Sequence, residues 1–281
     1  MTQDDSIKKK IPIMDEEFES MRKLWYKNEN ILFNIIESTK YRETAFLGEY
    51  CVRCMKVNAV RYLQKNFDRN RFFQKPFMIY FSLSKFPNIP MFSFNQQERR
   101  EQQDEFNTNY LKFITGYDFL FDFDNPNLML SYSTTYKVKK IFDERKIPYS
   151  LIFSGSKGFH IRVHYEDMCD ELKSMSFPDL CLLFKTFAEN FKLKEKLFDI
   201  DLGIFDLRRI AKVPYSIAYP FYFVALPLTD EQFENFSLKQ VSLPYLLERT
   251  DKLYKRGILK RDGVKGNFKK LIDEYVLNKN I

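Results

Sequence analysis

Residues 117–126 read YDFLFDFDNP, an apolar stretch that is interrupted by aspartates at positions 118, 122 and 124. Side chains along a β-strand alternate between its two faces. One face therefore carries the aromatic residues at the odd positions, which would pack into a core. The other face carries Asp118, Leu120, Asp122 and Asp124. Asp118 is expected to lie further along this face, as a helper residue or as a plain surface residue.

Asp122 and Asp124 lie two positions apart on the predicted strand, so they project side by side with their backbones about 7 Å apart. Two carboxylates at this spacing repel, and one takes up a proton unless a cation compensates the charge. Carboxylate oxygens are hard ligands that suit Mg²⁺ or Mn²⁺. The pair predicts either a divalent-metal site or, as the plainer alternative, a strand whose polar face meets solvent.

A glycine-containing turn follows in the segment FSGSKGFHIRVHY at 153–165. Gly155 and Gly158 allow the backbone to turn tightly and approach a ligand, and the N–H groups of such a turn can hold a phosphate. Lys157 adds positive charge. The strand that follows carries three basic side chains on one face, namely His160, Arg162 and His164. This gathering favours a triphosphate-binding turn over a plain tight hairpin with an exposed face.

The segment DIDLGIFDLRRIAKVPYSI at 199–217 places acidic residues close to basic ones. The basic residues are Arg208, Arg209 and Lys212. A third carboxylate from this segment would complete a site for two cations, and the basic residues could hold phosphates. Together these parts fit phosphoryl transfer, in which two cations activate the attacking hydroxyl and stabilise the leaving pyrophosphate. No G-x-S-x-G or Walker A motif points to another chemistry.

The remaining pattern mixes helical and extended segments and predicts an α/β chain of the α+β type. Further strands are predicted as a hairpin about Gly48 and as single runs, at 41–57, 75–83, 149–153, 159–165, 207–213 and 219–226. Helices are predicted at 14–39 (a pair), 58–67, 128–146 and 178–192, with a helical tail from 230. The polar segment 94–107 reads as a solvated helix or loop.

The 281 residues carry a net charge of +7, which suits a polyanionic partner such as nucleic acid. The four cysteines indicate a reducing compartment without a disulfide framework. Cys51 and Cys54 form a C-x-x-C, but on a predicted strand they point to opposite faces, so we expect no structural zinc.

No apolar run reaches the ~20 residues of a membrane span. No signal peptide is recognisable either, and we expect a soluble intracellular protein.

The three segments FDFD, SGSKGFHI and DLGIF resemble, in order and spacing, the motifs of the archaeo-eukaryotic primase superfamily. An upstream stretch, YRETAF followed by YCVRCMKV, is similar to the small catalytic subunit through Arg42, Glu43, Phe46 and Arg53. The resemblance runs from about residue 40 to 225. It implies the primase fold, in which an RRM-like catalytic core packs on a second sheet with flanking helices. One catalytic domain over 1–281 is expected, with N-terminal helices (1–40), a core (41–228) and a helical tail (229–281).

The resemblance also implies roles for individual residues. Asp122, Asp124 and Asp201 would be the catalytic carboxylates that bind two Mg²⁺ or Mn²⁺ ions, with Asp199 as the rival of Asp201. The nucleotide-binding residues would be Ser154, Gly155, Lys157, Gly158, His160, Arg162, Arg209 and Lys212. Two features depart from the family pattern. Ala218 stands where relatives carry a histidine, and 125–140 contains no Cys or His, so the zinc-binding insertion is absent.

The function implied is a DNA primase catalytic subunit that joins NTPs, or dNTPs, de novo on single-stranded DNA. A large regulatory subunit would be its partner, and the location would be cytoplasmic or nucleoid, as in archaea. A stand-alone primase-polymerase of a plasmid, virus or repair system is the first alternative. A non-catalytic RRM-like subunit that binds nucleic acid is the second, and the complete set of three aspartates argues against it.

Overall fold

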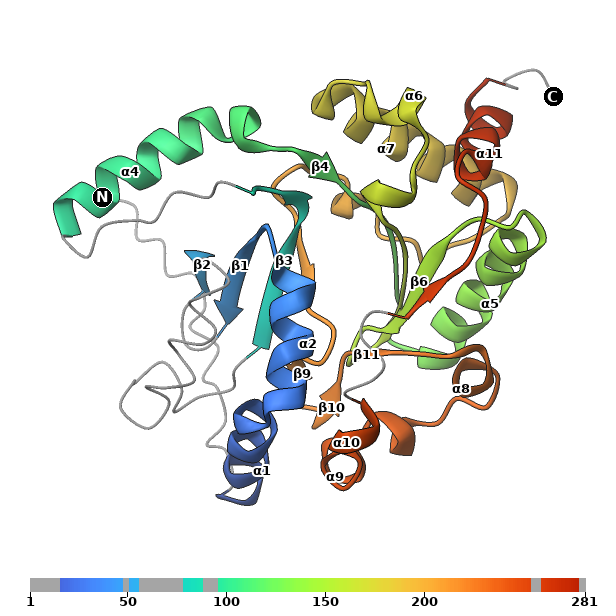
Figure 1. The fold of residues 1–281 in the computed structure, drawn as a ribbon. Helices are drawn as coiled ribbons and strands as arrows, with labels where there is room; N and C mark the ends of the chain where they lie inside the picture. Colours follow the sequence, from blue (N-terminus) through green and yellow to red (C-terminus); the bar gives the residue numbers. More distant parts are fainter. Residues whose placement is uncertain (1–15, 48–50, 56–77, 88–95, 254–258, 278–281) are drawn as a thin grey trace, which may run out of the picture.

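The computed structural model describes residues 16–47, 51–55, 78–87, 96–253 and 259–277. Two five-stranded sheets stand beside each other in the middle of the molecule, and helices flank them (Figure 1). The first sheet contains β1 (Arg42–Leu47), β2 (Cys51–Met55), β3 (Met78–Lys85), β4 (Gly116–Tyr117) and β8 (Ile210–Lys212). The second contains β5 (Phe119–Asp124), β6 (Tyr149–Phe153), β7 (Gly158–Val163), β11 (Leu226–Pro227) and β12 (Lys260–Arg261). A small ribbon pairs β9 (Ile217–Ala218) with β10 (Phe223–Val224).

The helices fall into three groups that follow the order of the chain. Near the chain start lie α1 (Glu16–Lys27), α2 (Glu29–Thr39) and α4 (Gln96–Asn109). The central helices are α5 (Leu128–Glu144), α6 (Asp170–Lys173) and α7 (Phe177–Lys194). The last group is α8 (Asp230–Glu234), α9 (Leu243–Leu247), α10 (Thr250–Leu253) and α11 (Asn267–Val276). Short 3₁₀ turns occur at η2 (Tyr110–Phe113), η3 (Tyr165–Asp167), η4 (Leu202–Ile204) and η5 (Leu238–Val241). None of the helices described is both long and apolar enough to cross a lipid bilayer.

The second sheet has the arrangement of a split β-α-β unit. Both β5 and β6 pair antiparallel with β7, which lies between them, and α5 connects β5 to β6. After α7 the chain returns to the free edge of β5, where Ile200 bridges Phe123. The order is that of the β-α-β-β-α-β motif. The predicted RRM-like core packed beside a second sheet is therefore confirmed.

Alternation along β5 separates a core face from a polar face, as the sequence predicted. Phe119 packs edge-to-face on Phe184 of α7 at 5.2 Å, and Phe121 lies 5.4 Å from Phe191 of the same helix. Such aromatic pairs contribute about 0.5–1.5 kcal/mol beyond the area that they bury. Side-chain caps begin the covering helices, as where Asn127 accepts from the Met129 N–H at the start of α5. The opposite face of β5 turns toward the first sheet.

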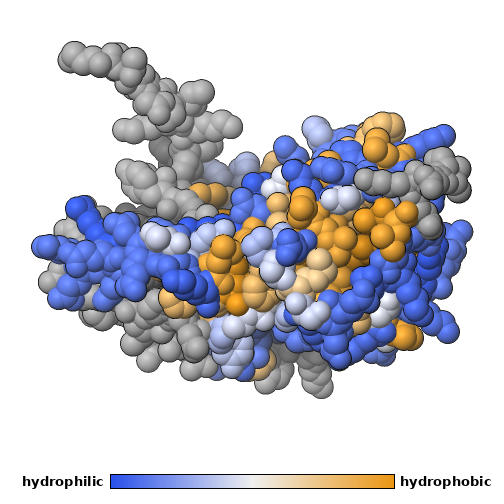
Figure 2. All heavy atoms as spheres, turned by 90° about the horizontal axis from the view of Figure 1, so that it is seen from above, coloured by the Kyte–Doolittle hydropathy of each residue, from blue (hydrophilic) through white to orange (hydrophobic). Residues whose placement is uncertain are grey.

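The first sheet carries α1 and α2 against one side. The indole N–H of Trp25 donates to the carbonyl of Tyr215 at 2.8 Å, and the hydroxyl of Tyr26 accepts from the Ile217 N–H at 2.9 Å. These bonds tie the start of the chain to the β9 region almost two hundred residues later. Helix α4, by contrast, extends away from the body as a hydrophilic arm (Figure 2), which agrees with its polar sequence.

Two predictions about these elements need correction. Asp118 is not a surface residue, because it is fully buried between the sheets. The tail is not wholly helical either, because β12 pairs antiparallel with β6 through Lys260 and Ser150. Strand β12 has two residues, which is too short for a strand pattern to show in the sequence. These residues are extended because they pair with β6. The predicted helix at 58–67 and the hairpin tip at Gly48 lie outside the described residues.

Candidate active site

A cavity of about 250 Å³ lies where the two sheets meet. Its lining comes from β3, β5, β7, β8 and the turn between β6 and β7. The residues are Tyr80, Asp122, Asp124, Ser154, Ser156, His160, Ile204, Arg209, Ile210, Ala211 and Lys212. Segments that are distant in sequence thus bring carboxylates and cations to one place.

Asp122 and Asp124 share the face of β5 that forms the cavity wall. Burial alone would raise the pKa of Asp122, but His160, Lys212 and Arg209 together outweigh it and hold this pKa below its usual value. The pKa of Asp124 is raised, first by burial and then by the charge of Asp122. A raised pKa beside a lowered one is the sign of two carboxylates that repel. A divalent cation between them would remove this repulsion, so the donor set fits Mg²⁺ or Mn²⁺.

The basic side chains of the cavity face these carboxylates. His160 lies opposite Asp122 in the β5–β7 pair, with Nε2 of the ring 3.4 Å from the Asp122 carboxylate. Lys212, from β8, donates from Nζ to the Ser154 carbonyl at 2.9 Å. Burial lowers the pKa of Lys212 to about 8, although Asp122 and Asp124 oppose the shift. Lys212 thus retains its charge at neutral pH in a poorly solvated position, where it can bind an anion strongly.

The glycine turn needs its glycines for two different reasons. Gly155 adopts φ +91°, a left-handed conformation that favours glycine. Gly158 touches β5 so closely that an added Cβ would lie 1.6 Å from the carbonyl oxygen of Phe123. Ala218 lies directly under Gly155, with its Cβ 2.8 Å from the place of an added Cβ there. Ala218 is fully buried and packs against the turn.

Asp201 and Asp199 both lie beside β5, but their carboxylates differ. The Asp201 N–H donates to the Asp122 carbonyl at 2.9 Å, which places Asp201 next to Asp122. Its half-exposed carboxylate accepts from the Gly203 N–H and faces Arg209 at 3.4 Å. The carboxylate of Asp199 instead accepts from Asn125 and from the Thr134 hydroxyl.

Asp201 is consequently the better placed of the two rivals, because the hydrogen bonds of Asp199 turn its carboxylate toward Asn125 and Thr134. Neither aspartate is among the residues that line the cavity itself. Asp201 reaches the site only through its neighbours Asp122 and Arg209.

The other predicted site residues lie partly at the cavity and partly away from it. Ser154 and Arg209 line the cavity, and Lys157 is exposed beside it, where its charge partly offsets the rise in the pKa of Asp124. Arg162 lies elsewhere, since its guanidinium stacks 4.7 Å over the ring of Phe81 and is buried. The backbone of Arg53 belongs to β2, and its side chain is outside the described part of the chain.

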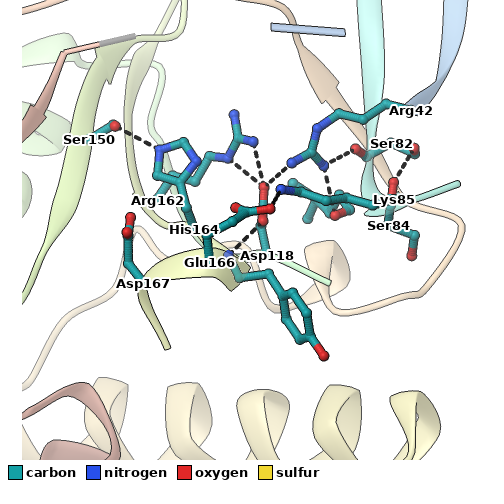
Figure 3. A network of polar contacts seen from close by, with 12 residues as sticks. Arg42, Ser82, Ser84, Lys85, Asp118, Ser150, Arg162, His164, Glu166 and Asp167 are labelled. Atoms are coloured by element: carbon teal, nitrogen blue, oxygen red, sulfur yellow. Dashed lines mark hydrogen bonds and ion pairs between the residues drawn. The ribbon is translucent and has the colours of Figure 1, made fainter. Parts of the chain in front are cut away.

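A buried charge cluster, defined here by Asp118, Arg42 and Arg162, joins the two sheets at the other end of this face (Figure 3). The Asp118 carboxylate accepts from Arg42 at 2.5 Å, from Nε of Arg162 at 2.7 Å and from the Tyr165 N–H at 2.9 Å. Burial would raise the pKa of Asp118, but the two guanidinium groups hold it well below its usual range. Burial also lowers the pKa of Arg42 to about 10. Glu43, next to Arg42, is buried and lies 3.5 Å from Arg208.

Among the described residues, ligand atoms of Asp118, His164 and Glu166 converge closely enough to suggest a metal site. Their surroundings argue against one. Arg42 and Arg162 already occupy the Asp118 carboxylate, and Lys85 pairs with Glu166. The pKa of His164 lies well below its usual value, first because the ring is buried and then because Arg162 is close to it. A divalent cation would be repelled here, so we assign this group to the charge cluster.

No model of a protein family matches the sequence, and no curated protein is similar to it. Solved structures do resemble the fold. One is a polymerase domain from Mycobacterium tuberculosis Ligase D in complex with DNA, which aligns over 92% of this chain and 92% of that chain. Its TM-score is 0.55 and its sequence identity 11%. The chain thus has a primase-polymerase-like fold, as the motifs predicted.

Five residues that line the cavity were absent from the sequence prediction: the polar residues Tyr80 and Ser156, and the apolar residues Ile204, Ile210 and Ala211. Tyr80 pairs across the first sheet with Lys212, and Ser156 sits in the glycine turn. Ser156 could have been included, because the variable positions of the S-G-x-x-G turn lie at its tip. Nothing near Tyr80 in the sequence indicates a site, since only the pairing of β3 with β8 brings it to the cavity.

Proposed function

We propose that the chain is a DNA-directed nucleotidyltransferase of the primase-polymerase type, which joins nucleotides on a single-stranded template. One observation carries the proposal: Asp122 and Asp124 share a cavity with the glycine turn and Lys212. Carboxylates that repel one another next to a phosphate-binding turn are the arrangement that two-metal nucleotidyl transfer requires.

The residues have separate roles in this reaction. Asp122 and Asp124, with Asp201 beside them, would hold Mg²⁺ or Mn²⁺, which lower the pKa of the attacking hydroxyl and neutralise the leaving group. Lys212, His160, Arg209 and the turn at 154–158 hold the triphosphate. The attacking hydroxyl would give its proton to water, its oxygen would form a bond to the α-phosphorus, the bond to the bridging oxygen would break, and pyrophosphate would leave with that oxygen. The protein contributes position and charge, with no covalent intermediate.

Within this class, the primase catalytic subunit with a large regulatory subunit remains the reading implied by the motifs. The stand-alone primase-polymerase is a second candidate, supported by the alignment along most of its length with a polymerase domain. Both readings use the same carboxylates and the same template.

The test is a synthesis assay with the full chain, single-stranded DNA, Mn²⁺ and either NTPs or dNTPs. One set of templates carries an annealed primer and the other none. We expect labelled product in both sets, with length set by the template. Product only from primed templates would restrict the chain to primer extension. No product from either set, with correctly folded protein, would contradict the proposal.

Replacing Lys212 by Met is expected to raise the KM for the incoming nucleotide about tenfold to a hundredfold, because a charge-assisted hydrogen bond contributes ~1.5–3 kcal/mol. The methionine keeps the buried aliphatic volume, so the fold should persist. Steady-state kinetics with varied nucleotide concentration measure the effect. Lys140→Met on the exposed face of α5 is the matched control and should change nothing. An unchanged KM in Lys212→Met would remove Lys212 from the nucleotide site.

A further inference from the structure

A second and larger cavity, of about 440 Å³, lies at the opposite end of the seam between the two sheets. Its lining shares no residue with the candidate active site. The residues are Tyr41, Lys85, Pro87, Thr115, Tyr165, Glu166 and Lys173. Among the residues that the structure describes, two aromatic rings, two lysines and one acidic side chain line this cavity.

Tyr41 has an unusual conformation for an aromatic residue. Its φ is +60°, a left-handed value that is rare for bulky side chains and costs energy. The conformation belongs to the tight turn from α2 into β1, in which Lys40 has φ −55° and ψ 129°, and it leaves the Tyr41 side chain 51% exposed. Nζ of Lys40 lies 5.4 Å from the ring centroid. The backbone therefore presents an aromatic face with a neighbouring cation toward solvent.

Tyr165 forms the other aromatic wall and is held firmly. An added Cβ on Gly116 would lie 2.8 Å from its ring, so the ring rests on bare backbone. Its hydroxyl donates to the Lys173 carbonyl at 3.2 Å. Nζ of Lys173 lies 6.0 Å from the same ring and donates to the Glu166 carbonyl at 3.1 Å. The Glu166 carboxylate pairs with Lys85, which leaves the balance of charge around the cavity positive.

The location of this cavity relates it to the active site. Strand β3 carries Tyr80 in the active-site cavity and Lys85 in the second one. Five residues along a strand span about 16 Å. Because this spacing is odd, the Tyr80 and Lys85 side chains leave opposite faces of β3, and the buried charge cluster fills the seam beside Lys85. A ligand that reached both cavities would therefore be an extended chain that crosses the surface. Aromatic faces with neighbouring lysines are surfaces that bind single-stranded nucleic acid.

We propose that the second cavity binds the single-stranded template away from the reacting end. A base stacks on Tyr41 or Tyr165, and Lys173 neutralises a neighbouring phosphate. The inference rests on the proposed function in taking the strand to be the template. A free nucleoside triphosphate fits less well, since the cavity offers no uncompensated carboxylate for its cation.

The experiment measures fluorescence anisotropy of a labelled single strand of about 16 nucleotides, the upper site size of such modules, with the full chain and no nucleotides. Tyr41→Asn removes the ring, and Asn tolerates the left-handed backbone, so the fold should be retained. We expect about tenfold weaker binding, whereas Tyr41→Phe should bind as wild type. Tyr136→Asn, at an exposed tyrosine on α5, is the matched control.

Lys173→Met supplies a second readout that a purely structural role would not change. Loss of one phosphate contact should reduce the slope of log affinity against log salt by about 0.7. Wild-type affinity in both Tyr41→Asn and Lys173→Met, or no strand binding by the wild type, would overturn the inference. A third outcome would also overturn it. If a dNTP alone displaced the strand from the wild type but not from Tyr41→Asn, the second cavity would bind a free nucleotide.

The two proposals fail in different ways. If wild type synthesises product but the cavity variants bind DNA normally, only the second cavity is wrongly assigned. If wild type synthesises nothing while Tyr41→Asn and Lys173→Met still weaken strand binding, the binding site stands and the proposed reaction falls.

Discussion

Asp122→Asn is expected to reduce template-dependent synthesis by about a thousandfold or more, because cation-mediated stabilisation contributes several kcal/mol to the transition state. Asparagine has the same shape but lacks the charge that holds the cations. The pKa of Asp122 is lowered because its charge interacts favourably with His160, Lys212 and Arg209, so a modest loss of stability without loss of the fold is expected. Single-turnover synthesis with saturating template and Mn²⁺ measures the loss, and thermal unfolding confirms the fold.

Asp201→Asn and Asp199→Asn form a matched pair for the third carboxylate. Asp201 lies beside Asp122 with its carboxylate half exposed, whereas the Asp199 carboxylate is bound by Asn125 and Thr134. We expect synthesis to be lost in Asp201→Asn and retained in Asp199→Asn. The reverse pattern would transfer the metal-binding role to Asp199. Full activity in Asp122→Asn, Asp124→Asn and Asp201→Asn together would mean that the chain does not use two-metal chemistry.

Asp118→Asn is expected to lower the free energy of unfolding by about 3–5 kcal/mol, the usual cost of removing one partner from a buried ion pair. Arg42 and Arg162 are both enclosed between the sheets, so the asparagine would leave two buried charges without a counter-charge. Chemical denaturation at neutral pH, monitored by far-UV circular dichroism, gives the difference.

The control is Glu274→Gln, which removes the partner of Arg145 in a partly exposed pair between the end of α5 and α11. Exposed pairs contribute only about 0–1 kcal/mol, so this variant should resemble wild type. Similar small effects in both variants would show that Asp118 does not hold the two sheets together.

The acid limb of the stability curve provides an independent check on Asp118. Because the folded-state pKa of Asp118 is lower than its unfolded value of about 3.9, its contribution is complete above that pH. It is lost as the pH falls further. Wild type should therefore lose stability toward low pH more steeply than Asp118→Asn, and parallel curves would argue against a depressed pKa.

The comparison of prediction and structure separates local from distant causes. Period-two alternation located β5 and its two faces, and the pattern S-G-x-x-G located the turn, because both depend on residues within one strand or turn. The burial of Asp118 could not be predicted in this way. Its partners Arg42 and Arg162 lie 76 and 44 residues away in sequence, and alternation alone gives the same face to a buried and an exposed aspartate.

The same reason explains Arg162 and Tyr80. Arg162 shares a strand face with His160, but the two residues lie at different points along the seam between the sheets. Arg162 lies at the charge cluster, and His160 lies at the active-site cavity. Tyr80 gives no sign of a site in its own strand. It reaches the cavity because β3 pairs with β8 and so places it opposite Lys212.

By itself, the sequence determined which residues could supply the chemistry: two aspartates on one strand face, a glycine turn with basic neighbours, and a third acidic segment. These follow from backbone geometry over a few residues. The tertiary structure alone decided which of them meet. Docking the first sheet on the polar face of β5 brought Lys212 and Tyr80 to Asp122 and Asp124, and buried Asp118 between two arginines. Such contacts depend on how distant strands pair and pack, which no local pattern encodes.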